Sequence, residues 1–87
     1  MKIRILYFAA LRDALDRADE SLDTQAATLA ELRAELATRG GVWAERFGAD
    51  SPAARRVKAA LDQTMAAGDA ALHDGAEVAF FPPVTGG

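Results

Sequence analysis

The chain contains no cysteine among its 87 residues, and it has only one histidine. Without cysteine there is no disulfide framework, no thiolate metal site and no cysteine nucleophile. The single histidine, His73, stands beside a predicted turn with no second histidine or paired carboxylate at ligand spacing. We therefore interpret His73 as a surface residue rather than a metal ligand or general base, and we predict no metal site.

Long apolar runs are also missing. No stretch approaches the roughly 20 apolar residues that a membrane-spanning helix needs. The first eight residues are interrupted by Lys2 and Arg4, which is not the pattern of a signal peptide. The net charge of −3 argues against nucleic acid as the main partner, because neutralising phosphates requires clustered lysine and arginine. These absences predict a cytoplasmic protein with neither a membrane nor a nucleic-acid partner.

What the chain does have is strand and helix periodicity in alternation. Residues 2–8 carry Ile3, Ile5 and Tyr7 on one face and end with apolar side chains on both, which predicts a central strand covered on both sides. Further strands are predicted at 20–24, near an edge, and at 56–61. A short helix is predicted at 9–15 and another helical turn around Trp43 and Phe47, whereas 64–71 fits either a weak strand and loop or a helical turn.

The clearest helix is predicted at 28–39. Thr28 is suited to the N-cap position and Glu31 follows three residues later, which is a capping box. One stripe of this helix is apolar and comprises Leu29, Leu32 and Leu36. Gly40 and Gly41 then supply the positive φ angles that end a helix.

The last eleven residues dominate the interpretation. Residues 77–81 predict a strand, and Pro82 and Pro83 end it because each lacks an N–H group and fixes φ. Phe80 and Phe81 point to opposite faces, so one is expected in the core, while the other is either core or an exposed partner contact. Residues 83–87 are expected to form an exposed, flexible tail ending in Gly86 and Gly87.

Together these elements predict an α+β domain spanning 1–87. A mixed sheet of four or five strands would pack on one main helix, with the first and last strands parallel at its centre. That is the β-grasp, or ubiquitin-like, fold. Four basic residues are expected to flank the exit of the tail, as a solvated face or as a contact for an acidic partner. They are Lys2, Arg4, Arg56 and Lys58.

The segment 74–87, with its Phe-Phe-Pro-Pro-Val-Thr-Gly-Gly ending after Asp-Gly, resembles the C-terminus of the molybdopterin synthase small subunit family. Weaker similarity covers the whole chain, at 5–12, 28–32 and 59–63. The chain departs from the family's pattern at Asp62, where asparagine is common, and at Ala76, where an acidic residue is common. Both lie in predicted turns.

The resemblance implies a protein-based sulfur donor that is not catalytic alone. Gly87, preceded by Gly86, would be adenylated and converted to a thiocarboxylate, which would donate sulfur to cyclic pyranopterin monophosphate and form the molybdopterin dithiolene. It implies no cofactor on this chain, because ATP is used by the activating partner. The implied partners are the synthase large subunit in a heterotetramer, an E1-like adenylating enzyme and a sulfur donor enzyme. The implied partner contacts are Phe80, Phe81, Pro82, Pro83, Val84 and Thr85.

Two other functions stay open. The chain could be a different ubiquitin-like sulfur carrier, serving thiamine thiazole synthesis, tRNA thiolation or cysteine synthesis. It could also be a ubiquitin-like interaction module or protein modifier with no role in sulfur transfer. A Gly-Gly ending is shared by all of these, and terminal glycines alone are equally typical of a frayed chain end. The Phe-Phe-Pro-Pro-Val segment favours the molybdopterin synthase subunit.

Overall fold

The computed structural model describes residues 1–82 and has one five-stranded sheet with three α-helices and a 3₁₀ turn. The elements in chain order are β1 Lys2–Tyr7, α1 Ala9–Leu15, β2 Asp19–Asp23, α2 Leu29–Ala37, α3 Val42–Phe47, η1 Ala54–Arg56, β3 Lys58–Leu61, β4 Thr64–Met65 and β5 Glu77–Phe81. The predicted α+β, β-grasp arrangement is confirmed. Residues 64–71, left undecided from the sequence, form the short β4 followed by a loop.

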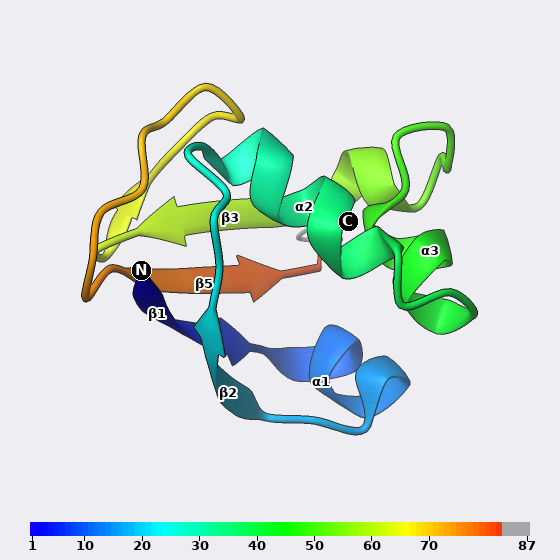
Figure 1. Ribbon diagram of the computed structural model, residues 1–87. Helices are drawn as coiled ribbons and strands as arrows, with labels where there is room; N and C mark the ends of the chain where they lie inside the picture. Colours follow the sequence, from blue (N-terminus) through cyan, green and yellow to red (C-terminus); the bar gives the residue numbers. More distant parts are fainter. Residues whose placement is uncertain (83–87) are drawn as a thin grey trace.

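The sheet order is β2-β1-β5-β3-β4 (Figure 1). β1 and β5 are parallel, with Ile5 opposite Val78 and Tyr7 opposite Phe80, and the other strand pairs are antiparallel. The first and last strands therefore lie side by side, as predicted, and β2 is an edge strand. β5 runs between β1 and β3, so its end is fixed on both sides.

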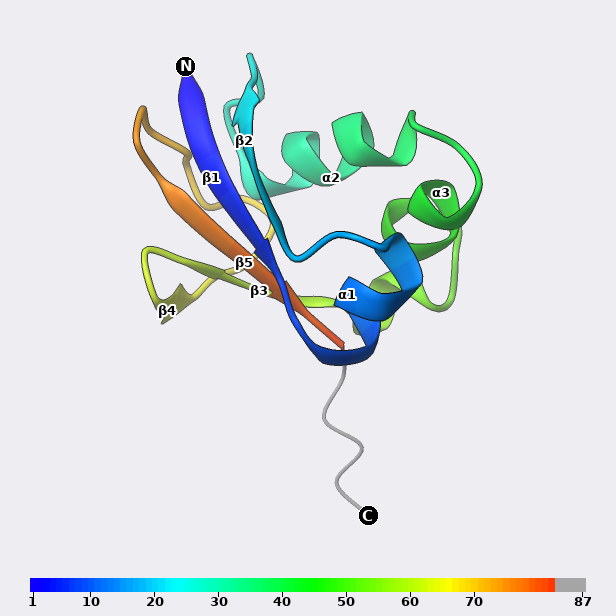
Figure 2. The ribbon, with the colours of Figure 1, turned by 90° about the horizontal axis from the view of Figure 1, so that it is seen from below.

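The helices share one side of the sheet (Figure 2). The side chains of Ile3, Ile5, Tyr7, Val78 and Phe80 point to that side and are fully or almost fully buried. They pack against the apolar stripe of α2, which is also fully buried and comprises Leu29, Leu32 and Leu36. This layer between sheet and helices is the core.

α2 begins where its capping residues predicted. The Thr28 Oγ1 accepts a hydrogen bond from the Glu31 N–H at 3.2 Å, which satisfies one of the free donors of the first turn. After the helix, Gly40 and Gly41 have φ angles of 77° and 54°, in the region that glycine occupies at low cost.

Two expectations about strands are wrong. β1 is covered on one face only: Lys2, Arg4 and Phe8 are exposed, and Leu6 is half-buried. Arg56 does not start a strand, because it ends η1, and β3 begins at Lys58. The Val57 N–H bonds to the Ala54 carbonyl at 3.2 Å, a turn contact that local alternation does not reveal.

Candidate functional site

The C-terminal end of β5 is where the chain leaves the sheet. The Phe8 N–H donates to the Phe80 carbonyl at 3.1 Å, and Lys58 lies opposite Phe81 in the register. The exit is therefore bounded by the end of β1 and the start of β3. Pro82 is half-buried and is the last described residue. The predicted site residues Pro83, Val84, Thr85, Gly86 and Gly87 lie outside the described part.

Phe80 is the buried anchor of this exit. Its ring is fully buried and lies 5.0 Å from the Phe47 ring and 6.3 Å from the Tyr7 ring, centroid to centroid. The Arg33 guanidinium lies over the same ring at 5.4 Å. A side chain without exposed surface offers a partner no contact, so the prediction that Phe80 binds a partner is wrong for its side chain. Its role is to fix the end of β5.

Phe81 points to the opposite face, which no helix covers, and it is half-buried. On this outer face, a row across the sheet joins Leu6, Ala79, Ala60 and Met65. Phe8 extends the face beyond the end of β1, because its backbone is still extended. We call the six side chains Leu6, Phe8, Ala60, Met65, Ala79 and Phe81 the outer patch.

Two members of the outer patch are large and strongly exposed: Phe8 is 47% and Met65 61% accessible. Apolar side chains gathered on one uncovered face are typical of an interaction surface. Neither residue was predicted from the sequence as part of an exposed surface. Phe8 follows Lys2 and Arg4 at even spacing along the strand, and this alternation could have predicted that Phe8 lies on their exposed face. The position of Met65 depends on the two-residue strand β4, which the sequence does not define.

The four basic residues do not all gather at the exit as expected. Lys58 is there, opposite Phe81, but Lys2 and Arg4 lie at the start of β1. Since β1 and β5 are parallel, the start of β1 is at the far end of the sheet from the exit. Arg56 ends η1, two residues before β3 begins, so it lies at the same end of the sheet as Lys58. Lys58 pairs with Phe81 and therefore borders both the exit and the outer patch.

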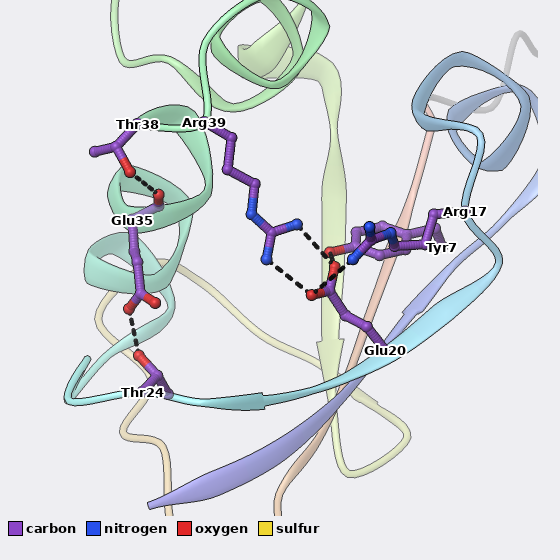
Figure 3. Close-up of polar contacts among 7 residues, drawn as sticks. All are labelled: Tyr7, Arg17, Glu20, Thr24, Glu35, Thr38 and Arg39. Carbon is purple, nitrogen blue, oxygen red and sulfur yellow. Dashed lines mark hydrogen bonds and ion pairs between the residues drawn. The ribbon is translucent and has the colours of Figure 1, made fainter.

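A polar cluster supports the exit from the helix side (Figure 3). The Tyr7 hydroxyl donates to Glu20 Oε2 at 2.8 Å, and Arg39 donates to both Glu20 oxygens at 2.9 and 2.8 Å. Arg17 adds a 3.2 Å ion pair to Glu20. Arg39 also lies over the Trp43 ring, 4.3 Å from its centroid. The cluster joins β1 and β2 to the C-terminal end of α2.

The protonation of this cluster indicates a structural role. Burial and the Glu20 carboxylate raise the pKa of Tyr7, so the hydroxyl remains a donor. Burial alone would raise the pKa of Glu20, but the hydrogen bonds from Arg39 and Tyr7 outweigh it and lower that pKa. A carboxylate kept ionised by an arginine fork and a phenol kept protonated form a stable bridge rather than an acid–base pair.

His73 is exposed, as predicted, and lies in the turn before β5, at the end of the sheet away from the exit. Its Nε2 is 2.6 Å from Asp62 Oδ2, and the Glu77 N–H donates to Asp62 Oδ1 at 3.0 Å. The hydrogen bond that the His73 ring N–H donates to the Asp62 carboxylate raises the pKa of His73. The Glu77 N–H, followed by His73, lowers the pKa of Asp62. These contacts tie the β3–β4 turn to the start of β5.

Within residues 1–82, no three histidine, aspartate or glutamate side chains come together as metal ligands would. In the same part of the chain, no helix has the length and apolar character needed to cross a bilayer. The feature of the described body that points to function is thus the strand end with the outer patch beside it.

Comparison with known proteins places the chain among small carrier proteins. Residues 5–87 match the ThiS family. The chain is 35% identical over 85 residues to the molybdopterin synthase sulfur carrier subunit of Escherichia coli, covering 98% of this chain and 99% of that protein. The fold matches the crystal structure of SAMP1 from Haloferax volcanii with a TM-score of 0.81 and 26% identity, covering all of both chains.

A second similar structure is a complex. It is the protein–protein complex of subunits 1 and 2 of the molybdopterin-converting factor from Helicobacter pylori. The match has a TM-score of 0.67 at 24% identity and covers both chains completely, and at that identity it supports the shared fold.

Proposed function

The chain belongs to the ThiS family, and from this premise we propose that it is the sulfur-carrier subunit of a molybdopterin synthase. The observation that carries the proposal is the 35% identity to the Escherichia coli sulfur carrier subunit, which extends over almost the full length of both proteins. The Phe-Phe-Pro-Pro-Val-Thr-Gly-Gly ending supports it, because a general Gly-Gly carrier does not require the segment before the glycines.

The reacting group in this proposal is the Gly87 carboxylate. A carboxylate is a poor electrophile, so an activating enzyme first uses ATP to form the Gly87 acyl-adenylate and releases pyrophosphate. A sulfur donor enzyme then supplies the sulfur that displaces AMP and leaves a thiocarboxylate. Sulfur passes from there to cyclic pyranopterin monophosphate, and two such transfers form the dithiolene. The absence of cysteine is compatible with this route, because sulfur is carried on the main chain.

The main partner in this proposal is the large subunit of the synthase, with two copies of each subunit in the assembly. The Escherichia coli relative is named as one subunit of that enzyme. The outer patch suits a docking surface, since Phe8 and Phe81 border the strand end from which the tail leads. Buried Phe80 holds that strand end, so a partner bound to the patch receives the tail from a fixed origin.

The experiment is intact-mass analysis of the chain after incubation with ATP, its activating enzyme and a sulfur donor. Loading replaces one oxygen by sulfur and raises the mass by the difference between the two atoms. A chain lacking Gly87, and one with an alanine added after it, are the matched controls and stay unloaded. The loaded chain is then mixed with large subunit and pterin precursor, and dithiolene formation is measured.

The outcomes separate the alternatives. Loading without dithiolene formation identifies another sulfur carrier of the family. Attachment to protein lysines without loading identifies a modifier. Normal dithiolene formation by the chain lacking Gly87 would refute the mechanism.

A further inference from the structure

An open groove of about 360 Å³ lies beside the start of β3. One wall is formed by the end of α3 and by η1, and the other by β4 and the loop that follows it. Three cationic side chains line it, Arg33, Arg55 and Lys58, and none of its lining residues is acidic. The remaining lining is apolar or small and includes Phe47 and Met65. The whole chain carries a net charge of −3, whereas the lining of the groove is positively charged.

Arg33 lines the groove and is fixed there by backbone carbonyls. Its Nη2 donates to the Val57 carbonyl at 2.8 Å and its Nη1 lies 3.4 Å from the Ala54 carbonyl. Burial lowers the pKa of this guanidinium. Two bonds leave further N–H donors of the five free for a ligand. In the described part of the chain, no carboxylate lies within 4.0 Å of the cationic group of Arg33, Arg55 or Lys58.

The groove is continuous with the outer patch. Met65 lines the groove and also ends the apolar row on the outer face. Lys58 lines the groove and lies opposite Phe81 at the strand end. A protein that covers the outer patch and accepts the tail therefore reaches the groove by passing around the β3–β4 edge.

We propose that this groove binds an acidic segment of the protein that receives the tail, with carboxylates on the three cations and an apolar side chain on Phe47 and Met65. The inference rests on the proposed function. A mixed cationic and apolar lining matches a peptide that carries both kinds of side chain. Because such pairs at a rim act through long-range attraction, they raise the association rate and fix orientation, and salt weakens them.

The first test measures binding of the full-length chain to the large subunit of its synthase. The double variant Arg55→Glu with Lys58→Glu is expected to bind at least about tenfold more weakly at low salt, with a smaller difference at high salt. Lys2→Glu with Arg4→Glu is the matched control: it makes the same charge change at the far end of β1 and is expected to bind nearly as the unaltered chain does. Equal weakening in both doubles would show a general charge effect and overturn the proposal.

The second test uses a carbodiimide, which joins an amine directly to a carboxylate in ion-pair contact. We expect a Lys58 cross-link to an aspartate or glutamate of the large subunit, identified by peptide mass spectrometry, and none at Lys2. A bound complex without a Lys58 cross-link would overturn the proposal. NMR spectra provide a further check. If ATP shifts the amide signals of the groove residues and the large subunit does not, the groove binds a nucleotide and the proposal is overturned.

These results are distinguishable from failure of the proposed function. If the unaltered chain does not bind the large subunit or is not loaded at Gly87, the proposed function fails. If it binds and loads but the groove variants bind equally well, only the acidic-segment inference fails.

Discussion

At the scale of single residues, two adjacent phenylalanines have separate roles because strand side chains alternate. Phe80 is fully buried between the rings of Tyr7 and Phe47, and Phe81 is half-buried on the uncovered face. The sequence predicted that the two would point to opposite faces and that one would be in the core, but not which one, nor whether the other would be exposed. The assignment depends on β5 pairing with β1 in a register that places Phe80 beside Tyr7.

The pair provides a controlled experiment on stability and binding. Phe80→Ala is expected to lower the free energy of unfolding by about 3–5 kcal/mol, because it leaves a cavity in the core. Phe81→Ala, the matched control at the next position, is expected to cost less than about 1.5 kcal/mol but to weaken binding to the large subunit. Urea unfolding and titration calorimetry measure the two effects. Equal losses of stability would contradict the assignment of faces.

At the scale of elements, the β3–β4 hairpin places two consecutive non-glycine residues at positive φ. Its two turn residues, Asp62 and Gln63, have φ angles of 50° and 70°. A two-residue hairpin turn of this kind needs positive φ at both positions and favours asparagine or aspartate followed by glycine. Asp62 fits that preference, and its carboxylate accepts a hydrogen bond from the Glu77 N–H. Gln63, in contrast, carries a side chain at the position where glycine is preferred.

Replacing Gln63 by glycine is therefore expected to stabilise the protein by up to about 1 kcal/mol, because relief of the strain at the left-handed position exceeds the entropy that glycine loses on folding. The measurement is the urea midpoint. Ala60→Gly, inside β3, is the control and is expected to lower the midpoint, because a strand interior gains nothing from glycine. A lower midpoint for Gln63→Gly would show that the Gln63 side chain has a stabilising contact that outweighs the turn geometry.

Elements with strong local signals were predictable, and elements held by distant contacts were not. α2 has a cap, an apolar stripe and glycines at its end, and β5 has alternation and prolines, so both were placed closely. The start of β3 was missed because η1 is held from α2, through Arg33 bonds to the Ala54 and Val57 carbonyls. The outer patch and the groove were missed for a similar reason, since Met65 and Lys58 reach them only through strand pairing.

At the scale of the whole molecule, the sheet separates two tasks. Its helix side buries the core, and its other side carries the outer patch beside the strand end. The cluster around Glu20 links the two layers, since it connects β1 and the edge strand β2 to Arg39 after α2. The Glu20 side chain is only 10% exposed, so its ionised form depends on the donors around it. The stability of the layered arrangement should therefore depend on pH through this carboxylate.

The direction of this pH dependence follows from the lowered pKa of Glu20. The folded protein holds Glu20 ionised below the pH of about 4.3 at which a free glutamate titrates, so the stabilisation is present above that pH and is lost as pH falls through the folded pKa. Glu20→Gln removes the charge and is expected to cost about 1–3 kcal/mol at pH 7, with a difference from the unaltered chain that shrinks below about pH 4. Urea unfolding between pH 7 and pH 3 measures this difference in stability.

Glu45→Gln, an exposed change on α3, is the control and should follow the unaltered chain throughout. A Glu20→Gln difference that stays constant across this range would show that the loss comes from packing rather than from the carboxylate charge.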